Sequence, residues 1–118
     1  MPKALPVLDV TSPICCAPVA AAPMDAGVAL QVALRLKALA DPTRVRIVSL
    51  LLTDPDGEVC TCDLAEHVGL TEATTSHHLG QLKRAGLVVP TRRGANVFYA
   101  VRRDALSALA GVLDPACC

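Results

Sequence analysis

The sequence predicts a small, mainly α-helical domain with one β-hairpin near its C-terminal end. Apolar residues recur every three or four positions over most of the chain from Met24 onward, which is the period of helices with one buried face. The run 87–103 is different, because β-branched and aromatic residues flank a Gly-Ala-Asn turn sequence at 94–96. The 118 residues include only two aromatic residues, Phe98 and Tyr99, so we expect one modest core of aliphatic side chains.

Two helices are predicted before residue 54. The first begins near Met24. The second begins at Pro42, where Asp41 is a good N-cap and a proline at the first helical position loses no hydrogen bond. It ends at the turn sequence 54–57. The expected apolar stripes are Val28, Val32, Leu36 and Leu39 in the first helix and Val45, Val48 and Leu52 in the second.

A short helix and a longer one follow. We expect the short helix at Asp63–Val68, with Gly69 as its C-cap, and the longer one from a Thr71 cap to Gly86. His67 is expected to face solvent and His78 to be packed or to cap. The expected inward residues are Leu64, Ala65 and Val68 in the short helix and Thr75, Leu79 and Leu82 in the long one. The opposite face of the long helix carries Thr74, His77, Gln81 and Arg84.

The C-terminal part completes a known supersecondary order. Pro90 cannot donate to a ladder, which places the first hairpin strand at a sheet edge. Leu106, Leu109 and Leu113 mark a last helix. Two helices joined by a short turn and followed by a basic hairpin describe a winged helix-turn-helix. We therefore predict five helices and a β-hairpin wing in a domain at 24–114.

The two ends of the chain lie outside this domain. Five of the nine prolines fall within 1–23, which predicts a flexible extended arm, and 115–118 is a short tail. No apolar run reaches the roughly 18 residues of a membrane span, and prolines with Asp9 interrupt any signal-peptide core. We expect a cytoplasmic protein without a membrane partner, in a compartment that keeps thiols reduced.

The formal net charge of the chain is zero, but its charges are unevenly distributed. The segment 71–103 carries six basic residues and the single acid Glu72, a balance of +5, and the rest is acidic. A local excess of Lys and Arg is typical of phosphate-binding surfaces. A solvated face without a partner has the same pattern, so charge alone leaves both readings open.

The six cysteines form three close pairs, Cys15-Cys16, Cys60 with Cys62, and Cys117-Cys118. Cys60 and Cys62 lie at a predicted helix N-terminus, where the helix dipole stabilises a thiolate, and thiolates bind soft ions. Residues two apart point about 200° apart on a regular helix. Both sulfurs therefore reach one ion only if the first turn is non-helical or unwinds.

Three segments, RLKALADPTRVRIVSLL, CTCDLAEHVGLTEATTSHHLGQLKRAGLV and RRGANVFYAV, resemble the ArsR/SmtB metalloregulatory repressors. The resemblance covers about Val32 to Leu113. It implies a homodimer through the first and last helices, with the helix from Thr71 in the major groove of double-stranded operator DNA and the hairpin on the flanking backbone. The implied DNA contacts are Thr71, Glu72, Thr74, Thr75, Ser76, His77, Arg92 and Arg93. Glu72 and His77 replace a frequent glutamine and a frequent arginine, so the operator sequence cannot be transferred.

The segment EVCTCD resembles this family's metal site on the helix before the recognition helix, which arm cysteines of the other subunit often complete. The implied ligands are Cys15, Cys16, Cys60 and Cys62, with Cys117 and Cys118 as optional ones. Ala65 replaces the third cysteine of the arsenic-type CxCxxC pattern, so the arm is needed. The family's zinc site on the last helix is missing, because 104–114 contains no histidine.

The inducer ion stays open between two classes. Three thiolates suit arsenite or antimonite, which we favour by a small margin, and four thiolates suit Cd(II) or Pb(II). No organic cofactor is expected. Two alternatives remain, a redox-sensing repressor switched by a Cys15–Cys60-type disulfide and a thiol metallochaperone. No Gly-rich phosphate loop or nucleophile–base arrangement indicates an enzyme.

Overall fold

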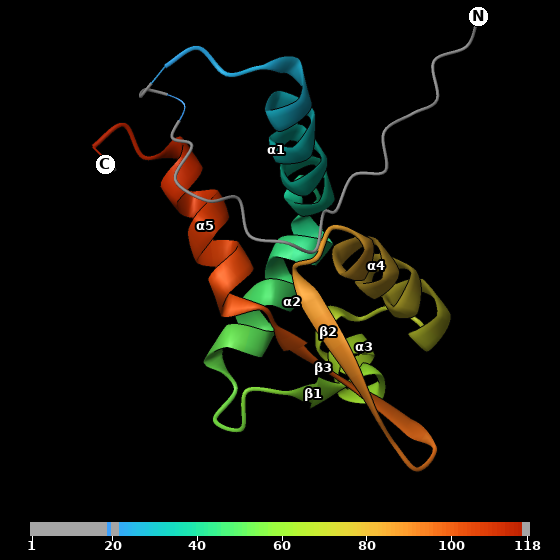
Figure 1. Ribbon diagram of the computed structural model, residues 1–118. Helices are drawn as coiled ribbons and strands as arrows, with labels where there is room; N and C mark the ends of the chain where they lie inside the picture. Colours follow the sequence, from blue (N-terminus) through green and yellow to red (C-terminus); the bar gives the residue numbers. More distant parts are fainter. Residues whose placement is uncertain (1–18, 20–21, 117–118) are drawn as a thin grey trace, which may run out of the picture.

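The computed structural model describes residue 19 and residues 22–116 of the chain. Cys15, Cys16, Cys117 and Cys118 lie outside the described residues, and so does nearly all of the predicted arm. The elements are α1 (Ala26–Leu39), α2 (Pro42–Thr53), β1 (Val59–Cys60), α3 (Thr61–Val68), α4 (Glu72–Arg84), β2 (Val88–Arg93), β3 (Asn96–Val101) and α5 (Arg103–Leu113). Figure 1 shows α1 and α5 extending away from a part formed by α2, α3, α4 and the sheet. None of the described helices is long and apolar enough to cross a membrane.

The predicted start of α2 is confirmed at the level of single atoms. The carboxylate of Asp41 accepts hydrogen bonds from the backbone N–H of Thr43 at 2.8 Å and of Arg44 at 3.2 Å. Pro42 occupies the first turn, where its missing N–H is not needed. Asp25 caps α1 in the same way through Val28 N–H, so α1 begins at Ala26, two residues after the predicted start.

The end of α3 and the start of α4, the two helices of the helix-turn-helix, have the predicted capping residues. Gly69 ends α3 with a φ of 73°, a left-handed conformation that glycine adopts without a Cβ penalty. Thr71 accepts a hydrogen bond from Thr74 N–H at 3.1 Å and caps α4. α3 begins at Thr61, two residues before the predicted Asp63, because Cys60 acts as its N-cap.

The wing is a three-stranded antiparallel sheet in the order β1-β3-β2. The predicted hairpin is confirmed, and β2 with Pro90 is an edge strand. Its turn is one residue shorter than predicted, since Asn96 pairs with Arg93. The sequence did not reveal β1, because a two-residue strand has no periodicity; β1 is held by the pairs Val59–Tyr99 and Cys60–Phe98.

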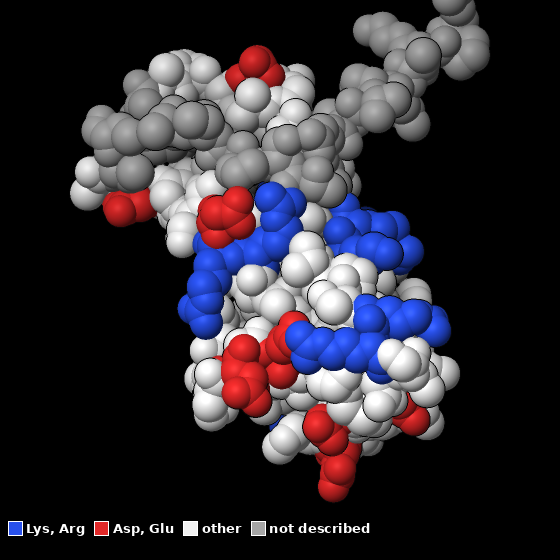
Figure 2. All heavy atoms as spheres, turned by 60° about the horizontal axis from the view of Figure 1, so that its bottom comes forward, with Lys and Arg blue, Asp and Glu red and all other residues white. Residues whose placement is uncertain are grey.

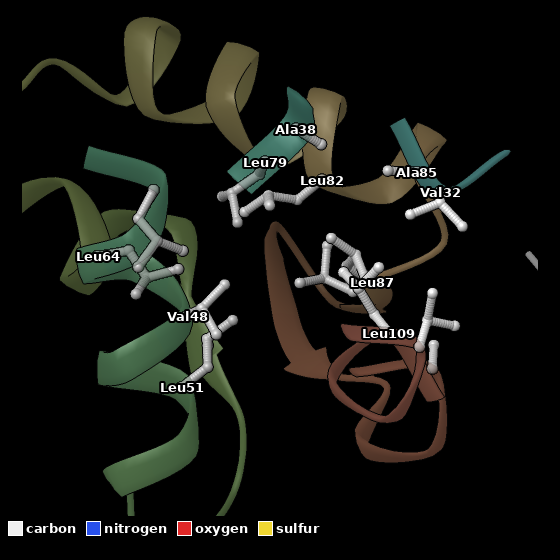
Figure 3. Close-up of a cluster of buried hydrophobic side chains, with 14 residues drawn as sticks. Val32, Ala38, Val48, Leu51, Leu64, Leu79, Leu82, Ala85, Leu87 and Leu109 are labelled. Carbon is white, nitrogen blue, oxygen red and sulfur yellow. The ribbon is translucent and has the colours of Figure 1, made fainter. Parts of the chain in front are cut away.

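Figure 3 shows the aliphatic core, to which all five helices, the connection after α4 and the start of β2 contribute side chains. The predicted inward face of α4 is confirmed, because Thr75, Leu79 and Leu82 have no exposed surface. The fully buried core also includes Ile47, Leu51, Leu64 and Leu87. Deletion of one such side chain to alanine removes about 2 to 5 kcal/mol of stability in a well-packed core.

The predicted stripe on α2 was wrong at Val45, whereas Val48 is buried and Leu52 is half-buried against the core. Val45 is 54% exposed, and the inward face is formed by Ile47, Val48 and Leu51. The helix is apolar on more than one side, so periodicity does not decide which side the core takes. On α5 the predicted Leu109 is buried, but Leu113 is 51% exposed and Val112 packs inward instead.

Candidate metal centre and nucleic-acid interface

Cys60 and Cys62 are joined by a disulfide, with their Cα atoms 5.4 Å apart. Cys60 is the last residue of β1 and has extended backbone angles, φ −72° and ψ 155°, whereas Cys62 is the second residue of α3. The two sulfurs meet because one cysteine lies before the helix and the other inside its first turn. The geometric condition deduced from the sequence, a first turn that is not fully helical at this pair, is therefore met.

The sulfur of Cys60 is buried and hydrogen-bonded, whereas Cys62 is exposed. The backbone N–H of Asp63 donates to Cys60 Sγ at 3.2 Å, as expected for an N-cap acceptor. Within the described residues, Cys60, Cys62 and Asp63 offer ligand atoms that all lie within 4.8 Å of one another. Asp63 was not among the predicted ligands, although the CTCD sequence places a carboxylate directly after the pair. Once the disulfide is reduced, two thiolates and one hard oxygen would make a partial site for a soft ion.

Cys62 also borders a hollow of about 180 Å³ between the helix-turn-helix and the wing. Two predicted DNA-contacting residues of α4, Glu72 and Ser76, line the same hollow together with wing residues 95–97. The cysteine pair therefore lies at the junction of the two elements that would meet DNA.

A second set of contacts links the cysteine pair to the wing. Cys60 lies opposite Phe98 in the β1–β3 ladder. The guanidinium of Arg93 stacks over the Phe98 ring, 5.1 Å from its centroid, and also forms an ion pair with Glu58, the residue before β1. The hydroxyl of Thr61 donates to the Val97 carbonyl at 3.4 Å. Arg93 on the wing is thus connected to the strand that carries Cys60 through two residues, Phe98 and Glu58.

The structure places most predicted DNA contacts of α4 on its exposed side. Thr71, Glu72, Thr74, Ser76 and His77 are exposed around the N-terminal half of the helix. The Thr71 and Thr74 hydroxyls lie 3.0 Å apart within the helix cap.

Thr75 does not belong to this group. Its side chain is 0% exposed, and its hydroxyl has no hydrogen-bond partner. A side chain enclosed by the core cannot reach a base edge, so we remove Thr75 from the candidate contacts. The helical projection had already placed it on the buried face.

The two histidines in the middle of α4 have different surroundings. His78 is half-buried, and its Nδ1 accepts a hydrogen bond from Arg44 Nε at 3.1 Å, which confirms the prediction of a packed histidine. His77 is exposed. His67 on α3 is exposed as well, as predicted.

The wing arginines are exposed on the edge strand β2, where Arg92 pairs with Val97 and Arg93 with Asn96. Figure 2 shows Lys and Arg side chains in several groups on one face, with acidic side chains directly beside some of them. The ion pairs Glu58–Arg93 and Asp104–Arg102 are of this kind. The positive charge counted along the chain is therefore partly neutralised in space.

The fold and the site define a winged helix-turn-helix regulator with a cysteine pair on the first helix of its helix-turn-helix. The family model described as "Bacterial regulatory protein, arsR family" matches residues 41–89, from the cap of α2 into β2. A solved homodimeric winged helix-turn-helix DNA-binding domain from Mycobacterium bovis is 34% identical, with a TM-score of 0.62 over 76% of this chain and 83% of that one. The chain belongs to the arsR family of bacterial regulatory proteins.

Curated relatives carry several regulator names. The transcriptional regulator CmtR of Mycobacterium bovis is 46% identical over 77 residues, 65% of this chain and 63% of CmtR. The cadmium resistance regulatory protein CadC homolog of Staphylococcus aureus is 40% identical over 61% of this chain and 58% of that protein. The arsenic resistance regulator ArsR1 of Pseudomonas putida is 41% identical over 53% of this chain and 48% of its own length. The chain thus spans less than two thirds of the length of these relatives.

Proposed function

We propose that this protein is a homodimeric transcriptional repressor that binds double-stranded operator DNA and releases it when a thiophilic ion binds Cys60 and Cys62. The observation that carries the proposal is the position of this pair between the helix-turn-helix and the wing. The family membership supports a regulatory rather than an enzymatic role. The chemistry of paired sulfurs supports a soft ion as the signal.

DNA binding would use two elements of each subunit. The exposed residues at the start of α4 would read the major groove, and Arg92 and Arg93 would hold the flanking phosphates. Glu72 can only accept hydrogen bonds, for instance from a cytosine amino group, and is repelled by phosphate. It would therefore restrict the operator rather than add general affinity.

Dimerisation would use α1 and α5. Leu30 and Leu34 lie four residues apart on α1 and are both exposed, and so is Leu113 on α5. Large apolar side chains grouped on one surface mark association sites. The homodimeric neighbour from Mycobacterium bovis supports a dimeric state.

The ion site would be completed by the arm. Cys60 and Cys62 supply two sulfurs. We propose that Cys15 and Cys16 supply the remaining one or two, because the family resemblance implies that arm cysteines complete this site. Arsenite, with three sulfurs, is the inducer we favour, and Cd(II) or Pb(II), with four, is the second candidate. The relatives support both, because one is named for cadmium resistance and another for arsenic resistance.

Release of DNA would follow from the contacts between the cysteine pair and the wing. An ion drawn to Cys60 and Cys62 would move the end of β1, which pairs with Phe98. Phe98 carries the stacked Arg93, so the wing arginine would change its position relative to the phosphate backbone. The bound ion would then weaken the affinity for DNA, and bound DNA would weaken the affinity for the ion by the same factor.

The test is a parallel titration of the reduced protein with arsenite and with cadmium. Thiolate-to-ion ultraviolet absorption and fluorescence anisotropy of labelled operator are followed together, and we expect release at one ion per site. Three sulfurs per ion would support arsenite, and four would support cadmium or lead. The variant Cys60→Ser with Cys62→Ser keeps a good N-cap at position 60 and should bind operator normally without releasing it. Normal release by this variant would refute the site.

A further inference from the structure

We propose that Cys60 and Cys62 are also a reversible oxidation site, at which a hydroperoxide forms the Cys60–Cys62 disulfide and closes the ion site while DNA binding persists. The oxidised protein would then be a repressor that no longer responds to its inducer. The loss of the response to the inducer rests on the proposed function. Its chemistry concerns the cysteine pair alone and can be measured without DNA or ion.

The backbone already holds the two cysteines in disulfide geometry. Their Cα atoms are 5.4 Å apart, inside the 4.4–6.8 Å range that a disulfide spans. With the disulfide in place, β1 keeps its pairing with β3, and Asp63 N–H keeps its hydrogen bond to Cys60 Sγ. The disulfide is therefore compatible with a formed α3 and an intact wing. The partner of Cys60 is Cys62, which differs from the Cys15–Cys60 pairing that the redox alternative assumed.

The two sulfurs differ in access, which assigns their roles. Cys62 is exposed and borders the hollow of about 180 Å³ beside α4 and the wing turn. Cys60 is 5% exposed and lies within the β1–β3 pairing. A small hydroperoxide in solution therefore meets Cys62 first, and Cys60 is positioned to react with the product.

The reaction balances in two steps. The Cys62 sulfur attacks the terminal oxygen of the hydroperoxide and the O–O bond breaks, which gives a sulfenic acid and releases an alcohol, or water when the oxidant is hydrogen peroxide. The Cys60 thiol then attacks the sulfenic sulfur, the S–S bond forms, and water leaves with the thiol proton. The pair loses two electrons, and the peroxide gains them. A dithiol reductant reverses the reaction by thiol–disulfide exchange.

The disulfide would separate the two activities of the protein. Ion binding requires thiolates, and a disulfide has none to offer. The proposed DNA contacts Thr71, His77 and Arg92 lie elsewhere, and they are exposed while the disulfide is present. An ion bound first would in turn protect both sulfurs from the peroxide.

A tryptic map of the full chain tests the chemistry directly. Cleavage after Arg46 and Lys83 releases a peptide that contains Cys60 and Cys62 and no other cysteine. After hydrogen peroxide and alkylation, we expect this peptide to be lighter by two hydrogen atoms and to carry no alkyl group. Treatment with dithiothreitol before alkylation should restore two alkyl groups, and arsenite present before peroxide should prevent the loss. A doubly alkylated peptide after peroxide, or Cys60 joined to another cysteine peptide, would overturn the proposal.

The functional consequence is tested on the same samples. The oxidised protein should bind operator as the reduced protein does, with complete loss of arsenite-induced release, and dithiothreitol should restore the release. Loss of operator binding on oxidation would overturn the inference. If the reduced protein ignores every thiophilic ion while the peptide still forms its disulfide, the proposed ion response fails and the oxidation site stands. The variant Cys117→Ser with Cys118→Ser is the control for disulfide formation alone, because it removes two other thiols and leaves the pair intact, and its Cys60–Cys62 peptide should still lose two hydrogen atoms.

Discussion

Glu58 and Arg93 form an ion pair that joins the residue before β1 to the last residue of β2. Arg93 is one of the two arginines proposed to hold the DNA backbone, and Glu58 lies two residues before Cys60. A carboxylate at this position competes with phosphate for the same guanidinium. The pair thus connects the cysteine strand to the proposed DNA surface through charge as well as through the sheet.

Glu58→Gln should tighten operator binding by the free protein. Exposed ion pairs contribute about 0–1 kcal/mol, so the gain is at most about fivefold in affinity. Ion-induced release should weaken, because Arg93 no longer depends on the residue before β1. Anisotropy titrations at several salt concentrations measure both effects. Asp56→Asn is the matched control, since it removes an exposed acid two residues away. Equal effects of the two variants would mean that only net charge matters.

Arg92→Ala with Arg93→Ala should weaken operator binding and flatten its salt dependence. Each lost phosphate contact lowers the slope of log K against log salt by about 0.9, and the dimer loses two contacts in each subunit, so the slope should fall by roughly 3 to 4. Arg92→Lys with Arg93→Lys preserves the charge and should retain most of the slope. An unchanged slope in the alanine variant would place the phosphate contacts elsewhere.

Thr75→Val should stabilise the protein and leave operator affinity unchanged. The Thr75 hydroxyl is buried without a hydrogen-bond partner, and such a group costs about 1–3 kcal/mol. Valine has nearly the same shape and lacks the polar atom. Chemical denaturation measures the stability, and anisotropy measures the affinity. A loss of affinity with normal folding would return Thr75 to the DNA contacts that the family resemblance implied.

Leu30→Asp with Leu34→Asp should convert the dimer into a monomer and weaken operator binding. The two side chains are 43% and 37% exposed on α1, and charges there would oppose an apolar interface. Light scattering after size exclusion gives the mass. Val45→Asp changes an equally apolar residue that is 54% exposed on α2, and it should remain dimeric. A dimeric double variant would exclude this face of α1 from the interface.

Asp41→Asn should reduce the loss of unfolding free energy that occurs as the pH falls into the acid range. Partial desolvation of the Asp41 carboxyl raises its pKa, but the hydrogen bonds from the N–H groups of Arg44 and Thr43 and the favourable electrostatic interactions with His78 and Arg44 outweigh it and hold the pKa below 3.8. Since the folded pKa is lower than the unfolded one, the ionised cap stabilises the protein above the unfolded pKa. This contribution is lost as the pH falls through the folded pKa. Denaturation midpoints between pH 7 and about pH 3 measure it. An identical acid limb in Asp41→Asn would contradict the assignment.

The helix ends could be predicted because their causes are local. Asp41, Pro42, Gly69 and Thr71 act through hydrogen bonds and backbone angles within three or four residues, and all four have the predicted roles. The hairpin and its edge strand follow from the same local chemistry at Pro90 and at 94–96. The family resemblance then placed the candidate DNA contacts and the cysteine pair on these elements.

The cysteine pair shows what the sequence determined and what only the tertiary structure decided. The spacing of Cys60 and Cys62 before a short helix was enough to predict a sulfur site and to state the condition under which both sulfurs could meet. That condition is met because β1 pairs with β3 and holds Cys60 extended just before α3. This pairing joins residues about forty positions apart in the sequence, and a two-residue strand has no hydrophobic periodicity that could predict it. The inward face of α2 was decided in the same way, by packing between elements rather than by neighbours in the chain.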